Sequence, residues 1–148
     1  MESVTIELGE DHPLLRETVR KICEGFPGEY WRQLEKEGAY PEDFIRALSR
    51  AGLLAALIPT EFGGSGVGLR AAAVILEEVN ACGCTASQGH AQMYIMGTLL
   101  RHGSEGQKWA YLPQIAAGDL RLQAFAITEP TSGSDTTNLK TRAVRDGA

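Results

Sequence analysis

The sequence is poor in cysteine, and its few cysteines exclude two classes of protein. Three cysteines among 148 residues cannot form the disulfide framework of a small secreted domain. Cys82 and Cys84 stand too close together to be a structural zinc pair, and the sequence has no second pair. We therefore expect reduced thiols, no metal site and a cytoplasmic location.

Long apolar runs and a strong basic charge are also missing. No run approaches the ~20 apolar residues that cross a bilayer, so we expect no membrane span. The opening residues, Met-Glu-Ser-Val-Thr, begin neither a signal peptide nor a basic transit peptide. A net charge of −5 argues against nucleic acid as a partner. The glycine run at residues 63–66 is no phosphate loop, because the Gly-Lys-Ser/Thr ending is absent.

Apolar residues recur at helical spacing over most of the chain, within an ordinary composition of 43% hydrophobic and 22% charged residues. We predict five helices, over residues 11–26, 41–51, 69–80, 85–101 and 104–118. The charged residues 30–38 are expected to form a short helical or irregular connection. An antiparallel helical bundle over residues 10–118 follows, with a core that contains Leu15, Ile22, Phe44, Leu48, Leu76, Met96, Leu99 and Leu112.

For two of the predicted helices we also predict which residues face the core, which face solvent and where the helix begins. The inner stripe of the helix over residues 69–80 is expected to consist of Leu69, Ala72, Ala73 and Leu76. Glu77 and Glu78 of the same helix are expected to face solvent. Ser104 and Gln107 have the spacing of a capping box, which begins the last helix. Trp109 is expected to line that helix.

The periodicity changes from 3.6 to 2 at Arg121, and we interpret this change as a domain boundary. A strand is predicted over residues 121–128, and a second one begins near Leu139. Two strands do not make a stable sheet by themselves. The predicted fold class is therefore mainly α: a helical domain over residues 1–119, followed over residues 120–148 by the first strands of a truncated β domain.

The end of the first predicted strand is the most informative stretch of the chain. Pro130 cannot donate to a strand ladder, and residues 131–135 form a turn rich in hydroxyls with one glycine. A strand that ends in such a loop presents free N–H groups, which can hold a pyrophosphate or a planar heterocycle. A plain connecting loop has the same composition, so these residues alone leave both interpretations open.

Residues 126–135, Ala-Ile-Thr-Glu-Pro-Thr-Ser-Gly-Ser-Asp, resemble the signature of the acyl-CoA dehydrogenase family. The resemblance continues through residues 138–141, where Asn138 replaces the small residue that is more usual. It extends to Tyr30-Trp31, the glycine turn at residues 63–66 and Gly118-Asp119. Members of this family have a helical N-terminal domain, a middle β domain and a C-terminal helical bundle, and this chain fits the first part of that plan.

The resemblance implies an FAD enzyme of fatty acid metabolism. Such an enzyme oxidises an acyl-CoA thioester to the trans-2-enoyl-CoA by α-proton abstraction and β-hydride transfer to flavin. It also implies an electron-transferring flavoprotein as electron acceptor and a homo-oligomer, either a tetramer or a dimer. The family's catalytic glutamate lies in the C-terminal domain, so it is expected beyond Ala148 and no catalytic residue is expected in this chain. The piece by itself is expected to be inactive and to lack FAD.

Matched residue by residue, the resemblance implies that the cofactor-binding residues are Phe125, Ile127, Thr128, Gly133 and Ser134. Ile127 and Thr128 would bond the pyrimidine side of the flavin, where negative charge collects as the ring accepts hydride. Ser134 would also approach the thioester arm of the substrate. His90, near the start of the helix over residues 85–101, would lie at the floor of the acyl cavity.

Two other functions are compatible with the same residues. A related flavoenzyme of the same fold, of the acyl-CoA oxidase or nitroalkane oxidase type, would keep the flavin and change the chemistry. A flavin-free helical assembly module would keep only the fold. The retained motif at residues 128–135 favours a flavin enzyme, whereas acyl chain length cannot be inferred from this sequence.

Overall fold

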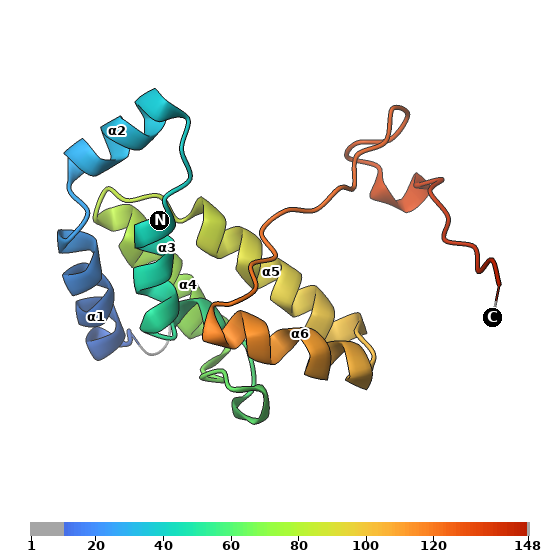
Figure 1. Ribbon diagram of the computed structural model, residues 1–148, viewed down its shortest axis with the longest axis horizontal. Coiled ribbons are helices and arrows are strands. Elements are labelled where there is room, and N and C mark those ends of the chain that lie inside the picture. Colours follow the sequence, from blue (N-terminus) through green and yellow to red (C-terminus); the bar gives the residue numbers. More distant parts are fainter. Residues whose placement is uncertain (1–10, 148) are drawn as a thin grey trace, which may run out of the picture.

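Helices follow one another along residues 13–117 in the computed structural model, which describes residues 11–147 (Figure 1). They are α1 (Pro13–Glu24), α2 (Gly28–Glu37), α3 (Glu42–Arg50), α4 (Gly68–Ala81), α5 (Ser87–His102) and α6 (Glu105–Ala117). Short 3-10 turns are η1 (Leu53–Ala55), η2 (Thr60–Phe62) and η3 (Thr136–Asn138). The mainly α fold class is therefore confirmed. The predicted domains also include residues 1–10 and Ala148, which lie outside the described residues.

Local signals locate several helix ends correctly. Pro13 is the first residue of α1, and the acidic residues Glu42 and Asp43 occupy the first turn of α3. The capping box of α6 is formed on both sides, because Ser104 accepts from the Gln107 amide and Gln107 accepts from the Ser104 amide. Each of these signals involves residues at most four positions apart, so it can be recognised from the sequence alone.

The charged connection at residues 30–38 is a full helix, α2. Trp31 and Leu34 make it amphipathic, and it ends at Gly38 in the left-handed region at a φ of 62°. Trp31 packs edge-on against the buried ring of Phe44, with ring centroids 5.0 Å apart, and this contact stabilises the helix against the core. A tertiary contact therefore decides between the helical and irregular interpretations.

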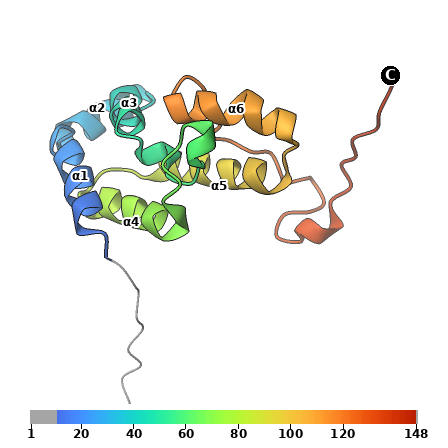
Figure 2. The same ribbon diagram turned by 90° about the horizontal axis from the view of Figure 1, so that it is seen from below.

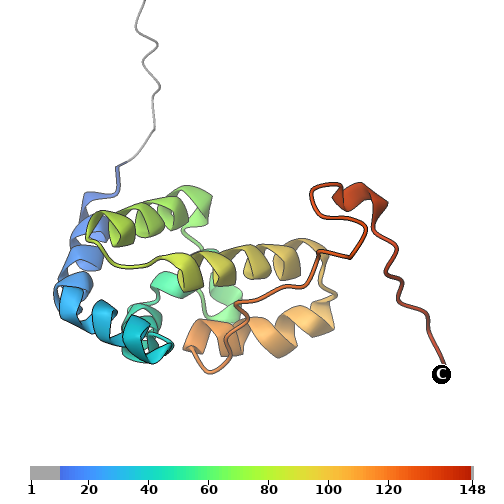
Figure 3. The same cartoon turned by 90° about the horizontal axis from the view of Figure 1, so that it is seen from above.

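Helices α4 and α5 lie on one side of the bundle, and α3 and α6 lie on the other (Figure 2 and Figure 3). The buried turn η1 lies between them and contacts α3, α5 and α6. Four of the predicted core residues are fully buried: Phe44, Leu48, Met96 and Leu112. The other four, which are Leu15, Ile22, Leu76 and Leu99, are partly buried and pack against that core.

The predicted inner stripe of α4 is wrong in part. Leu69 is 77% exposed and Ala73 is exposed, whereas Ala72 is buried. The buried residues of α4 are Ala71, Ala72, Val74, Ile75, Glu78 and Val79. Helix α4 packs against both α1 and α5. Its buried residues therefore face these two helices, and Leu69 lies on another side of α4. Trp109 of α6 is likewise 56% exposed, although its ring contacts Phe62 edge-on at 4.7 Å.

The expectation that Glu78 faces solvent is also wrong. Glu78 is only 4% exposed, and it accepts hydrogen bonds from two arginines of α1. Arg20 Nε lies 2.6 Å from Glu78 Oε1, and Arg16 Nη1 lies 2.9 Å from Glu78 Oε2. These bonds, from Arg20 first and then Arg16, hold the pKa of Glu78 below the ordinary glutamate value. Glu77 does face solvent, as predicted, and pairs with Arg16 at the surface.

The chain beyond α6 is extended and, among the described residues, forms no strand ladder. Its one bridge is the antiparallel exchange between Glu129 and Ser132. Residues 121–128 and the stretch after Leu139, both predicted as strands, have no neighbouring strand in the described part of the chain. A search of residues 11–147 also finds no helix with the length and apolarity that a membrane crossing requires.

Replacing the buried carboxylate should weaken the fold. We expect Glu78→Gln to lower the free energy of unfolding by about 1–2 kcal/mol, because Arg16 and Arg20 lose a charged acceptor. The depressed pKa means that this contribution is present above the unfolded carboxyl pKa of about 4.3 and is lost as the pH falls through the folded pKa. Urea unfolding at neutral and acidic pH measures both effects.

The matched control is Glu77→Gln on the same helix. Its carboxylate is exposed, so its removal should leave the unfolding midpoint unchanged. Equal effects of the two substitutions would contradict the burial of the Glu78 ion pair.

Candidate functional site

An ion pair attaches the start of the extended segment to the helical bundle. Arg121 donates two hydrogen bonds to the Glu42 carboxylate of α3, at 2.6 and 2.9 Å. Arg46 donates to the same carboxylate at 2.8 Å. The guanidinium groups of Arg121 and then Arg46 lower the pKa of Glu42 to about 2, so the carboxylate stays charged well into acidic solution.

A second attachment lies two residues further along the segment. The Gln123 amide donates to Gln92 Oε1 at 3.0 Å, and its oxygen accepts a hydrogen bond from the Tyr40 hydroxyl. Gln92 is 1% exposed, so this polar chain reaches the interior of the bundle from α5. The Arg121 guanidinium also lies 5.8 Å from the centre of the Tyr40 ring. Together these contacts define which way the segment faces, and Leu122 turns toward the core.

An apolar groove of about 520 Å³ lies between α5 and this segment. It is lined by Tyr94, Ile95, Thr98 and Leu99 of α5 and by Leu122, Ala124, Phe125 and Ile127 of the segment. Figure 3 shows the segment running past α5 toward the C-terminus. Phe125 is 58% exposed and meets Tyr94 edge-on, with ring centroids 4.9 Å apart. The groove is open on one side, and its walls can accept an apolar chain or a planar ring.

The backbone of the segment offers unused hydrogen-bond donors beside the groove. Within residues 11–147, the N–H groups of residues 122–128 donate to no acceptor. Thr128, at the end of this run, is exposed. Backbone N–H groups must be paired by a neighbouring strand, a ligand or water. The groove therefore has an apolar wall, and the segment that forms part of this wall has backbone donors without an acceptor among residues 11–147.

The loop after Pro130 is closed by the Glu129 carboxylate. This carboxylate accepts from the Lys140 amide at 2.9 Å, from the Thr141 amide at 2.7 Å and from the Thr141 hydroxyl. The Thr141 hydroxyl, followed by the two amides, lowers the pKa of Glu129. These hydrogen bonds occupy both oxygens, so the Glu129 carboxylate closes the loop. The catalytic glutamate expected beyond Ala148 falls outside the described residues, which end at residue 147, so its position stays a prediction.

The predicted site residues fall into two groups. Phe125 and Ile127 line the groove, and His90 reaches it through Tyr94, whose ring lies edge-on to the imidazole at 5.2 Å. Gly133 and Ser134 are exposed and are not among the residues that line the groove. The loop that carries them lies beyond the helical bundle (Figure 1 and Figure 2). No described atom lies within 4 Å of a Cβ built on Gly133, so that face of the loop is open.

Sequence reasoning missed the α5 wall of the groove. Tyr94, Ile95, Thr98 and Leu99 include pairs three and four residues apart, which is the signal of a helix face. That signal marks Leu99 only as a core residue, because a groove wall and a core stripe have the same period. Among residues 11–147, no cluster of three metal-ligating side chains exists.

Known families provide an independent comparison. Residues 9–119 match the family model described as "Acyl-CoA dehydrogenase, N-terminal domain". Cyclohex-1-ene-1-carbonyl-CoA dehydrogenase of Syntrophus aciditrophicus is 34% identical over 142 residues, which are 95% of this chain and 34% of that protein. The mitochondrial short-chain specific acyl-CoA dehydrogenase of Homo sapiens is 34% identical over 148 residues, which are 97% of this chain and 35% of that protein.

A solved structure described as the electron transferring flavoprotein of Acidaminococcus fermentans has a similar fold. Its TM-score is 0.79 at 25% identity, and the match covers 97% of this chain and 38% of that one. The chain thus spans about a third of the length of the relatives that it matches.

The Arg121 ion pair can be tested by its effect on the segment. We expect Glu42→Gln to increase the fast backbone motion of residues 120–124, because Arg121 then loses its charged acceptor. Heteronuclear nuclear Overhauser effects measure this motion. In the unsubstituted chain the segment should stay ordered from neutral pH to about pH 3 and loosen only as the pH falls toward the folded Glu42 pKa of about 2.

Asp43→Asn removes a neighbouring charge from the same helix turn and should leave the segment unchanged. If Glu42→Gln left residues 120–124 as ordered as before, the ion pair would not be what holds them.

Proposed function

The chain belongs to the acyl-CoA dehydrogenase family, and on this basis we propose that it is the front part of an FAD-dependent acyl-CoA dehydrogenase. Residues 1–119 form the helical N-terminal domain, and residues 120–148 begin the middle β domain. The family match over residues 9–119 ends where the extended segment starts, which supports this division. The whole enzyme converts an acyl-CoA to its trans-2-enoyl-CoA in fatty acid metabolism.

One observation carries the proposal: an apolar groove lies directly beside a row of unpaired backbone donors. A flavin needs an apolar surface for its ring and donors for its pyrimidine edge, and the segment at residues 122–128 provides both kinds of group. When bound, FAD supplies the acceptor for the hydride that leaves the β-carbon of the acyl chain. The residues of the segment fit this group in the chemistry of their donors.

Each site residue then has a distinct task. Ile127 and Thr128 donate to the pyrimidine edge, where negative charge collects during hydride transfer, and Phe125 covers the ring with its exposed face. Gly133 and Ser134 receive the pyrophosphate on the open face of the loop. The Glu129 carboxylate supports these roles, because its hydrogen bond with the Lys140 amide links the two ends of the loop that begins at Pro130.

The acyl part of the substrate occupies the groove along α5, which the exposed His90 borders through its contact with Tyr94, and Ser134 approaches the thioester arm. Tyr94 connects His90 with Phe125 through two edge-on ring contacts of 5.2 and 4.9 Å, so these side chains form one continuous wall. The base that removes the α-proton is a glutamate of the C-terminal domain, beyond Ala148. No residue of this chain takes part in that proton transfer.

We also propose the partners and the compartment. The electron acceptor is an electron-transferring flavoprotein, and the enzyme is a homo-oligomer, as the family resemblance implies. A cytoplasmic location agrees with the three free thiols, Cys23, Cys82 and Cys84.

The flavin proposal is tested in the full-length enzyme that contains this chain. We expect that enzyme to be yellow and to oxidise acyl-CoA with a dye as electron acceptor, whereas the 148-residue chain alone stays colourless. Thr128→Val should lower the rate of flavin reduction about tenfold, because one hydrogen bond to a developing charge is lost.

Thr131→Val in the same loop is the control and should leave flavin reduction unchanged. A colourless full-length protein would favour the helical assembly module, and rapid reaction of the reduced flavin with oxygen would favour an oxidase.

The acyl-groove proposal is tested at His90. We expect His90→Ala in the full-length enzyme to shift the preference toward longer acyl-CoA substrates, because Tyr94, which lines the groove, loses the imidazole that packs against it and can move outward. The measured quantity is kcat/KM across acyl chain lengths, and a shift of about tenfold between short and long chains is expected. His102→Ala, at the other end of α5, should leave the preference unchanged. An unaltered chain-length profile in His90→Ala would place the acyl chain elsewhere.

A further inference from the structure

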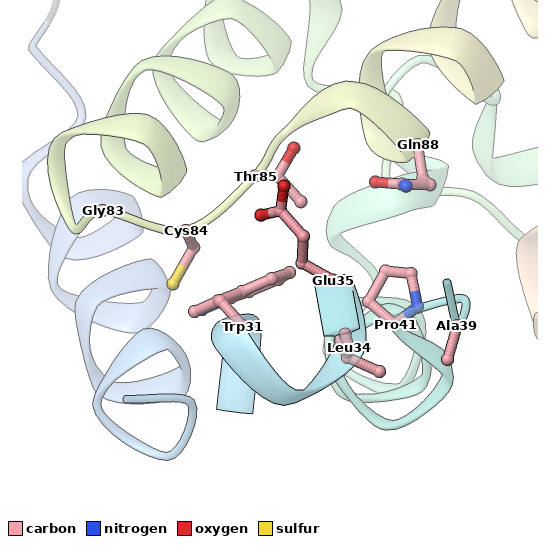
Figure 4. Close-up of a pocket in the computed structure, with 9 residues that line it drawn as sticks. All are labelled: Trp31, Leu34, Glu35, Ala39, Pro41, Gly83, Cys84, Thr85 and Gln88. Atoms are coloured by element: carbon pink, nitrogen blue, oxygen red, sulfur yellow. The ribbon is translucent and has the colours of Figure 1, made fainter. Parts of the chain in front are cut away.

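A second cleft lies between α2 and the loop that precedes α5 (Figure 4). Its volume is about 320 Å³, at the lower end of ligand pockets, which suits a side chain better than a cofactor. It is lined by Trp31, Leu34, Glu35, Ala39, Pro41, Gly83, Cys84, Thr85 and Gln88. None of these residues lines the groove beside Phe125, so this cleft is separate from the proposed flavin and acyl site.

One wall of the cleft is the ring of Trp31, which is held rigidly. The indole Nε1 donates to the Phe26 carbonyl at 3.0 Å, so the ring edge is already occupied. Phe44 and Tyr30 pack edge-on against the ring at 5.0 and 5.1 Å. The indole therefore offers the cleft a fixed aromatic surface and no hydrogen-bond donor.

Two side-chain acceptors in the cleft, on Gln88 and Glu35, receive no hydrogen bond or ion pair from the described residues, whereas the Thr85 hydroxyl is bonded to Ser87. Gln88 Oε1 is buried and has no hydrogen-bond partner among the described residues. Glu35 is exposed and its carboxylate forms no ion pair within residues 11–147; Figure 4 shows this side chain directed away from α2, toward the side of the cleft on which Thr85 and Gln88 lie. A buried acceptor without a donor is costly, and the cost is removed when a ligand supplies the missing hydrogen.

These features select the charge of the ligand. An anion would meet the Glu35 carboxylate, whereas a cation would be attracted both by this carboxylate and by the face of the Trp31 ring. The N-terminus of α5 contributes only about half a positive charge, which is less than the full negative charge of Glu35. A guanidinium is planar and carries several donors in a fixed fork, so it can stack on the indole while it donates to both Glu35 and Gln88.

We propose that this cleft binds the guanidinium group of an arginine side chain presented by a partner protein. The aromatic face, the unpaired carboxylate and the orphaned amide oxygen match the three properties of that group: a flat cation, a positive charge and spare N–H donors. The proposal does not depend on flavin binding or on acyl-CoA chemistry.

Titration of the 148-residue chain with N-acetyl-arginine methylamide tests the proposal. The chain has two tryptophans, so the indole N–H signals of Trp31 and Trp109 report on the cleft and on a surface outside it in one spectrum. We expect a saturable shift of the Trp31 signal and the Gln88 side-chain amide signals, and none of the Trp109 signal. The matching lysine compound should bind at least about fivefold more weakly, and the norleucine compound should not bind.

Substitutions then separate the cleft from general surface charge. Glu35→Gln should weaken arginine binding about tenfold, whereas Glu37→Gln on the same helix should leave it unchanged. Gln88→Leu should abolish the binding and also raise the unfolding midpoint, because an unsatisfied buried acceptor is removed. The proposal is wrong if Trp31 shows no saturable shift, if lysine or norleucine binds as well as arginine, or if Glu35→Gln binds like the unsubstituted chain.

Discussion

The two hydrogen bonds from Arg121 to Glu42, of 2.6 and 2.9 Å, connect the helical bundle with the extended chain that follows it. Everything proposed for the groove depends on this connection. If the segment left α3, then Phe125 would separate from Tyr94 and the groove would lose one wall. The bond is at the surface, but the second attachment through Gln123 reaches the buried Gln92, so the segment is held by one exposed and one interior contact.

The same segment is extended like a strand but has no neighbouring strand among the described residues. Its backbone groups can therefore take part both in a sheet and in ligand binding. Its N–H groups donate to nothing within the described chain, so they remain open to a neighbouring strand on one side and a ligand on the other. A strand that had already been paired on both edges could not also donate to a cofactor. The loop after Pro130 is held separately from this segment, because the Glu129 carboxylate closes the loop by accepting three hydrogen bonds.

Short-range signals in the sequence predicted much of the fold. The start of α1 at Pro13 and the capping box at Ser104 depend on groups a few residues apart, and both are confirmed. Glu78 could not be predicted, because its partners Arg16 and Arg20 lie 62 and 58 residues away on another helix. The groove shows the same difference. The family resemblance carried by residues 126–135 pointed to Ile127 and to the preceding Phe125, which both line the groove, whereas the α5 wall depends on which helix the segment crosses.

Helix α5 contributes residues to both the groove beside Phe125 and the Trp31 cleft, and its close packing against the core explains why. A Cβ built on the buried Gly89 would lie 3.2 Å from a methyl group of Leu54 in η1, so any larger residue here requires either the Leu54 side chain or α5 to shift. Gln88 on one side of this contact faces the Trp31 cleft, and Tyr94 further along the helix faces the groove. A shift of α5 would carry Gln88 and Tyr94 with it, so one packing contact affects the geometry of two separate sites.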